Sequence, residues 1–180
     1  MLVGNAAYTP PAFESISTVT VGSGGSTTVD ITSIPGTYKH LQVRAIIKTA
    51  AAGDGIRVRF NSDSGSNYAY HLLYGTGSTV GAASGASQTI ATIADATYSG
   101  TNADTFSATV IDILDYASTS KYKTVRSLAG YDLNGSGEVR ISSALWMSTS
   151  AITSMTFYNG GGSGDFQNKT TFALYGIKEL

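Results

Sequence analysis

The feature that most constrains the fold of this chain is a two-residue repeat of apolar and polar side chains. In residues 39–48 and 56–60 every second residue is apolar, and most residues between them are polar or basic. Successive side chains point to opposite faces in an extended strand, so this repeat predicts half-buried β-strands. Clusters of Gly, Ser, Asn and Asp separate the runs, as in tight turns between antiparallel strands. Helical spacing is hard to find.

About ten such runs follow one another along the chain. The predicted strands are residues 13–21, 26–31, 39–48, 56–60, 68–74, 88–93, 106–114, 123–129, 137–145, 152–158 and 170–177. The first two flank a Gly-rich turn, so we expect them to pair as a hairpin. Residues 75–103 are mostly Gly, Ala, Ser and Thr, and only 88–93 look strand-like there. The predicted fold class is all-β, an antiparallel β-sandwich that is jelly-roll-like with about ten short strands.

The composition indicates a folded domain of low charge. Hydrophobic residues make up 42% of the 180 residues, enough apolar side chain to offset the ordering entropy. Only 13% are charged, against about 25% in an ordinary soluble domain. The chain has 23 Ser and 23 Thr instead. Thr is polar and also favours strands, so outward sheet faces that carry Ser and Thr would explain the low charge.

The same composition excludes several classes of function. The absence of Cys rules out disulfides, thiolate zinc sites and a cysteine nucleophile, and two widely separated His argue against a His-based metal site. A net charge of −1 gives no electrostatic basis for binding nucleic acid. The sequence contains no run of 18 apolar residues, the length that could cross a bilayer, and the N-terminus lacks the features of a secretion signal. We therefore expect a protein that is made in a cytoplasm and binds neither nucleic acid nor membrane.

The chain divides into a short N-terminal segment and one domain. Two consecutive prolines in residues 1–12 exclude a helix and favour an extended, polyproline-like arm, which could reach a neighbouring molecule. The alternative is a frayed terminus. We expect residues 13–180 to form a single β-sandwich domain. The candidate partner-binding residues of the arm are Tyr8, Pro10, Pro11 and Phe13.

Two turn-like segments carry oxygen donors of the kind that calcium loops use. The residues at the first, third and fifth positions of one such loop are Asp132, Asn134 and Ser136. The twelfth position is Ser143, where a calcium loop needs Glu, and Asn-Gly between two strands is also a strong hairpin signal. Asn61 and Asp63 pose the same choice between an Asx-turn and a calcium site. The residues favour turns at both places and leave calcium open.

Residues suited to catalysis are scarce. The three Glu all lie near a chain end or a turn, whereas a glycosidase needs two carboxylates roughly 5 to 9 Å apart across a cleft. Asp112 lies in an apolar strand, where burial would raise its pKa, or where an Arg or the backbone would donate hydrogen bonds to it. His40 and His71 have no Ser nucleophile motif beside them, and no Gly-rich segment has the dinucleotide fingerprint. We expect no enzymatic activity, no catalytic residue, no cofactor and no bound metal.

Aromatic residues offer a further choice between packing and binding. They could stack against sugar rings, or they could fill the core and subunit contacts, and we favour the core interpretation. The residues concerned are Trp146 and Tyr68, Tyr70, Tyr74, Tyr98, Tyr116, Tyr122 and Tyr131.

Several strand-and-turn phrases, taken in order, resemble a family of small structural proteins encoded by tailed bacteriophages, common among marine and freshwater phages. The phrases are residues 13–16, 18–26, 34–44, 59–63, 112–116, 145–146 and 172–178. The resemblance covers nearly the whole chain, and none of its motifs contains a catalytic residue. It therefore implies a virion component and gives no site residues to transfer.

The resemblance leaves two roles open. A capsid decoration, or cement, protein would bind the outer surface of the shell and stabilise contacts between capsomers. It would contact the major capsid protein or other virion proteins, and a homo-oligomer, with a trimer favoured, is implied. A tail-fibre or spike domain would instead bind host surface glycans through its loops. The sequence has no coiled coil or collagen-like repeat from which a fibre shaft could form, and this favours decoration.

Overall fold

The computed structural model describes residues 12–51, 55–98, 100, 104–160 and 165–178. These residues form thirteen strands and no helix, and hence no helix long enough to cross a membrane. The strands are β1 (Phe13–Thr20), β2 (Thr28–Ile31), β3 (His40–Thr49), β4 (Ile56–Phe60), β5 (Tyr68–Gly75), β6 (Val80–Gln88), β7 (Ala91–Ala94), β8 (Thr97–Tyr98), β9 (Ser107–Ile113), β10 (Lys123–Asp132), β11 (Gly137–Trp146), β12 (Met155–Asn159) and β13 (Thr171–Ile177). The all-β prediction is confirmed, but the expected number of about ten strands was too low.

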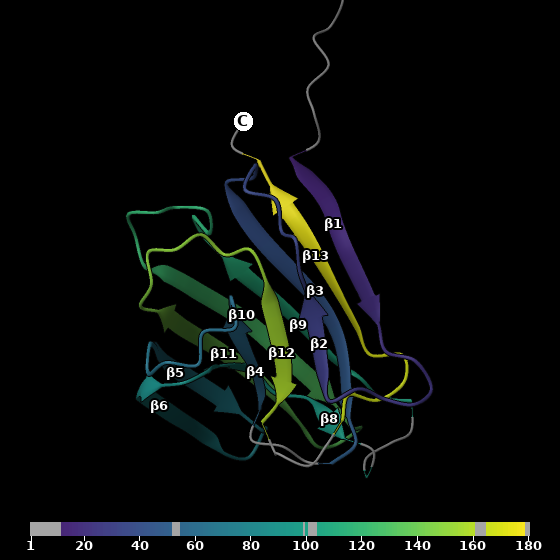
Figure 1. Cartoon of the computed structure of the whole chain (residues 1–180). Helices are drawn as coiled ribbons and strands as arrows, with labels where there is room; N and C mark the ends of the chain where they lie inside the picture. Colours follow the sequence, from purple (N-terminus) through teal and green to yellow (C-terminus); the bar gives the residue numbers. More distant parts are fainter. Residues whose placement is uncertain (1–11, 52–54, 99, 101–103, 161–164, 179–180) are drawn as a thin grey trace, which may run out of the picture.

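Eight of these strands form the two facing sheets of a jelly roll (Figure 1). One sheet contains the order β1-β13-β3-β9 and the other the order β2-β12-β4-β7. The first strand therefore pairs with the last, and strands β1 to β4 alternate between the sheets, as in a double Greek key. All strand pairs are antiparallel except the two-residue pairing of β3 with β8. The jelly-roll prediction is confirmed by this strand order.

Two inserted hairpins widen one of the two sheets. The hairpin β5–β6 follows β4 and the hairpin β10–β11 follows β9, and together they continue the large sheet in the order β9-β10-β11-β5-β6. With β8 the large sheet has nine strands, and the small sheet has four. Figure 1 shows β2, β4 and β12 in front of this broad sheet.

The strand β6 lies in the Gly- and Ala-rich stretch that shows no apolar alternation. Tyr70 and Tyr74 of β5 lie directly opposite Gly85 and Gly81 of β6. A Cβ atom at Gly81 would come within 2.4 Å of the Tyr74 ring, and one at Gly85 within 2.6 Å of the Tyr70 ring. Neighbouring rings, and not its own apolar residues, therefore account for this strand. The predicted strand 88–93 is confirmed only for residues 91–93, which belong to β7, because the chain leaves the large sheet after Gln88 and enters the small sheet at Ala91.

The predicted hairpin of residues 13–21 with 26–31 is also wrong. β1 pairs with β13 in the large sheet, where Val19 lies opposite Phe172. β2 pairs with β12 in the small sheet, where Val29 lies opposite Phe157. Both strands bury one face in the same core, and two strands in facing sheets satisfy this requirement as well as two strands in one sheet do.

An aromatic cluster ties the inserted hairpins to the small sheet. Phe60 of β4 contacts Trp146 of β11 with ring centroids 5.6 Å apart, and Tyr68 of β5 lies 6.4 Å from each of these rings. All three side chains are at most 2% exposed. The Phe60 N–H donates a hydrogen bond to the Tyr68 hydroxyl (3.0 Å), and Trp146 Nε1 donates one to an Asp63 carboxylate oxygen (2.7 Å). The core interpretation of Trp146 and Tyr68 is confirmed.

Replacing Trp146 by Ala is expected to lower the free energy of unfolding by about 3 to 5 kcal/mol, because it opens a cavity at the point where three strands meet. Urea denaturation followed by far-UV circular dichroism measures this loss. The matched control is Tyr122→Ala, at a ring that is 56% exposed, where we expect a change of no more than about 0.5 kcal/mol. Equal losses in the two variants would contradict the role given to the cluster.

Candidate functional site

The large sheet has an outer face, turned away from the small sheet, and a row of apolar side chains crosses its middle. The strand register places Val110, Leu128, Ile141 and Leu73 side by side on β9, β10, β11 and β5. Their exposed fractions are 38%, 56%, 49% and 60%, respectively. Arg44 of β3 is the next residue of this apolar row, beside Val110. Four large apolar side chains in a continuous exposed row are unusual on a monomeric protein.

Two further rows run parallel to the apolar row, one on each side of it. The Val139 row consists of Ile46, Ala108, Gly130, Val139, Gly75 and Val80 on β3, β9, β10, β11, β5 and β6. The Asp112 row consists of Gln42, Asp112, Arg126, Ser143, His71 and Ser84 on the same six strands. The outer face is therefore apolar in two rows and polar in the third.

Two open hollows lie on this face. One, of about 630 Å³, is lined by Leu73, Leu114 and Ile141 among others, and one of about 610 Å³ is lined by Ile46, Leu128 and others. The expectation that outward sheet faces carry mainly Ser and Thr is wrong for this part of the sheet. A signal existed in the sequence, because residues 110–114 are apolar on both sides of the strand apart from Asp112.

Asp112 belongs to the polar side of the outer face. Its carboxylate accepts hydrogen bonds from Gln42 Nε2 (2.8 Å) and from Arg126 Nη2 (2.9 Å), which confirms the expected Arg partner. Burial raises the pKa of Asp112. The hydrogen bonds from Gln42 and Arg126, together with the charge of Arg126, lower the pKa by more than burial raises it, so the pKa lies below its usual value. The carboxylate is thus paired, and its hydrogen bonds favour the ionised form.

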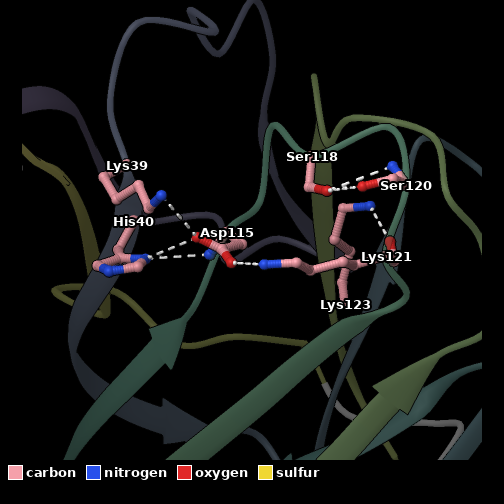
Figure 2. Close-up of polar contacts among 7 residues, drawn as sticks. All are labelled: Lys39, His40, Asp115, Ser118, Ser120, Lys121 and Lys123. Carbon is pink, nitrogen blue, oxygen red and sulfur yellow. Dashed lines mark hydrogen bonds and ion pairs between the residues drawn. The ribbon is translucent and has the colours of Figure 1, made fainter.

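A cationic cluster surrounds Asp115 at the end of β9 (Figure 2). Lys121 Nζ lies 2.7 Å from one carboxylate oxygen, and Lys39 Nζ lies 3.5 Å from the other. The Asp115 backbone N–H donates a hydrogen bond to His40 Nδ1 (3.0 Å), so the neutral His40 ring carries its proton on Nε2. The hydrogen bond from Lys121 is the largest of the effects that lower the pKa of Asp115.

Lys123, the first residue of β10, is buried and holds the loop that joins β9 to β10. Its side chain is fully buried, and its Nζ donates hydrogen bonds to the backbone carbonyl oxygens of Lys121 (2.8 Å) and Ser148 (3.4 Å). Burial lowers the pKa of Lys123. The ammonium group also lies 6.0 Å from the centre of the Trp146 ring, a cation–π contact that connects the loop to the aromatic cluster.

The Asp115 cluster is suited to holding a loop and not to catalysis. Asp115 contacts both Lys39 and Lys121, and Figure 2 shows that Ser118 and Ser120 interact with each other away from the carboxylate. None of the hydroxyls drawn there has a base as its partner, as a nucleophile would need. A hollow of about 230 Å³ beside the cluster is lined by these residues and by Tyr38 and Ala117.

The turn with Asp132, Asn134 and Ser136 is a tight hairpin turn. Asn134 and Gly135 have φ angles of 62° and 116°, so both central residues adopt the left-handed conformation of a type I′ turn. The Leu133 N–H donates to the Ser136 carbonyl (2.7 Å), and the Asn134 N–H donates to Asp132 Oδ1 (2.7 Å). The hairpin interpretation is confirmed, and the turn joins β10 to β11.

The Asn61–Asp63 segment is also an Asx-type turn, with several additional contacts. Asp63 accepts hydrogen bonds from the Gly65 N–H (2.9 Å), from Asn67 and from Trp146, and the bond from Trp146 contributes most to lowering its pKa. Asn61 Oδ1 accepts a hydrogen bond from the Thr153 N–H (2.8 Å). The side-chain oxygens of this turn thus serve the fold, joining β4 and β5 to the loop before β12.

Of the candidate arm residues, Tyr8, Pro10 and Pro11 lie outside the described residues. Phe13 is the first residue of β1 and is 45% exposed. Its ring lies 6.0 Å from the guanidinium carbon of Arg44, at the edge of the outer face. Phe13, which follows the arm in the sequence, therefore adjoins the Arg44 end of the apolar row.

Within the part of the chain that the structure describes, no three His, Cys, Asp or Glu side chains are grouped so that they could hold a metal ion. Comparison with protein-family models, with curated proteins and with solved structures finds no significant match.

The Asp115 cluster makes a prediction about titration. Lys121→Ala is expected to raise the pKa of Asp115 toward its ordinary value, and Lys39→Ala is expected to raise it less, because the Lys121 hydrogen bond is the larger effect. Since the pKa of the folded protein lies below that of the unfolded chain, the interaction stabilises the fold above the unfolded pKa and is lost as the pH falls through the folded value. Carboxyl-detected NMR titration measures both shifts, and a pKa of Asp115 unchanged by Lys121→Ala would contradict the assignment.

Proposed function

We propose that this protein is a structural component of a tailed-bacteriophage virion, most specifically a capsid decoration protein that binds the outer surface of the shell. The resemblance of its strand-and-turn phrases to phage structural proteins supports this role. The jelly roll adds support by analogy, because viral capsid proteins use this fold repeatedly. The analogy alone does not set a function, since lectins and enzymes share the fold.

The observation that carries the proposal is the exposed apolar row of Val110, Leu128, Ile141 and Leu73. Exposed apolar surface of this extent serves association with another protein in most soluble proteins. With only 13% charged residues in the chain, little charge has to be desolvated when such a face is covered. A protein whose main surface feature is an apolar sheet face is suited to assembly.

The N-terminal arm supplies a second contact in this proposal. Residues 1–12 contain one aromatic residue, Tyr8, and the rigid pair Pro10 and Pro11, and they contain no charged side chain. Rigid, uncharged segments lose little entropy and little hydration when they bind. The arm clamps a neighbouring subunit or the shell, and its partners are the major capsid protein or another virion protein and further copies of the chain, with a trimer favoured.

A tail-fibre or spike domain that binds host glycans is the second candidate. The hollow beside the Asp115 cluster supports it, because Lys39, Lys121 and the hydroxyls of Ser118 and Ser120 could donate hydrogen bonds to an acidic sugar. The pairing of both lysines with Asp115 reduces their capacity to bind another anion. The decoration role is therefore the stronger of the two.

Counting the copies of the protein in purified virions by quantitative mass spectrometry tests the proposal. We expect hundreds of copies, because a decoration protein follows the repeat of the shell, and a few dozen copies or fewer would favour the tail-fibre alternative.

Deleting residues 1–12 is expected to remove the protein from the virion while the domain stays folded. The matched control is the double replacement of Pro10 and Pro11 by Ala, which keeps the length and the apolar residues of the arm and should reduce occupancy less. Unchanged occupancy after the deletion would contradict the role of the arm, and absence of the protein from virions would contradict the whole proposal.

A further inference from the structure

We propose that the outer face of the large sheet binds a second copy of this chain, face to face, about a two-fold axis that runs along the strands between β10 and β11. This inference deepens the proposed function and rests on its claim that the outer face is an assembly surface. It names the occupant of that face and the register of the contact.

The apolar row is complementary to itself about this axis. A two-fold axis along the strands keeps each row opposite the same row and reverses the order of the strands. Leu128 of β10 then lies opposite Ile141 of the partner subunit, and Val110 of β9 lies opposite Leu73 of the partner subunit. Each contact occurs twice, so the four most central exposed apolar side chains of both copies are covered together.

The Val139 row fits the same axis at its centre, where a large residue lies opposite a glycine. Gly130 on β10 lies opposite Val139 of the partner subunit, and Ala108 on β9 lies opposite Gly75 of the partner subunit. Val139 thus faces a position without a side chain, which lets the two sheets interdigitate there at their usual separation of about 10 Å. At the border of the face, Ile46 lies opposite Val80 of the partner subunit.

The charges on the face are compatible with this axis. In the Asp112 row, Asp112 lies opposite His71 of the partner subunit, and Arg126 lies opposite Ser143 of the partner subunit. An axis centred on β10 would place Arg126 of the two copies against each other, and an axis across the strands along the apolar row would do the same to Arg44. Like charges directly opposite one another oppose association. The axis between β10 and β11 avoids both contacts, and among axes along the strands it is the one that pairs all four side chains of the apolar row with one another.

The size of the face suits such a pairing. Six strands about 4.8 Å apart and three rows about 6.8 Å apart cover roughly 600 Å² on each copy. Specific protein interfaces bury about 600 to 1,000 Å² on each partner, so the three rows reach the lower end of that range. The three rows do not include β1, so pairing through this face is compatible with a trimer that forms through the N-terminal arms.

Sedimentation equilibrium and light scattering of the full chain test the pairing. We expect pairing through the outer face to double the apparent mass, from the 18.6 kDa of one chain to twice that value, or from a trimer to a hexamer where the chains also associate through their arms. Concentrations up to about 100 µM detect even weak dimers. Leu128→Arg places two like charges beside the axis and is expected to halve the apparent mass. Leu128 is 56% exposed, so the variant should keep the far-UV spectrum and melting temperature of the wild type.

The matched control is Tyr122→Arg, which adds the same charge at an equally exposed apolar residue outside the three rows. It is expected to leave the apparent mass unchanged. A monomeric wild-type chain, or a folded Leu128→Arg variant that still doubles its mass, would overturn the inference.

Cross-linking tests the register itself. The chain has no Cys, so single cysteines can be introduced without a background. A mixture of Val110→Cys and Leu73→Cys chains should be joined by a bis-maleimide that spans about 10 Å, the separation of stacked sheets. Val110→Cys alone should be joined much less, because its two copies are offset by a further three strand spacings, about 14 Å. Equal yields in both samples would contradict the proposed axis.

The two proposals can fail separately. If Leu128→Arg is monomeric in solution but occupies virions as the wild type does, the paired face has no part in assembly on the shell, and the inference loses the function on which it rests. If the wild type is a dimer with the expected cross-links but is missing from virions, the pairing holds and the virion role fails. A wild-type monomer that occupies virions in hundreds of copies would overturn the pairing and retain the decoration role.

Discussion

The buried contact of Phe60, Tyr68 and Trp146 is the interaction on which the rest of the structure depends. It joins the small sheet to both inserted hairpins, because Phe60 comes from β4, Tyr68 from β5 and Trp146 from β11. With these rings in place the hairpins continue the large sheet instead of leaving it as separate loops. A jelly-roll sheet of four strands thereby becomes a broad surface, and only its inner side has the small sheet as a cover.

The outer side of the broad sheet carries most of the large apolar side chains that are exposed in the described residues. The polar clusters in the described residues stabilise the fold. Asp63 accepts a hydrogen bond from Trp146, Asp115 pairs with Lys121, and Asp112 pairs with Arg126. Most of the large apolar side chains that are exposed lie in rows that cross the outer face over the strands β3, β9, β10, β11, β5 and β6. An arrangement in which charges are paired and apolar rows are exposed favours association of protein with protein, and it is consistent with a component of a larger assembly.

Strands with a clear two-residue repeat could be predicted almost to the residue. The prediction for 56–60 coincides with β4, and 39–48 differs from β3 by one residue at each end. The strand β6 could not be predicted, because Gly81 and Gly85 owe their place to tyrosines on another strand. The hairpin predicted for β1 and β2 failed for a related reason, since alternation shows that a face is buried but not which strand lies beside it. At the candidate site, the turns around Asn61 and Asn134 were predictable from local chemistry, whereas the apolar rows were not.

By itself, the sequence determined the strands with a clear two-residue repeat, the tight turns and the exclusion of thiol chemistry, because these follow from residues that are neighbours along the chain. For strands such as β3 and β4 it also determined which side is buried. Only the tertiary structure decided that β1 pairs with β13, that two hairpins widen one sheet, and that Val110, Leu128, Ile141 and Leu73 stand in one row. The physical reason is that register between strands is set by packing across the whole core, and a row on a sheet face exists only once that register is fixed.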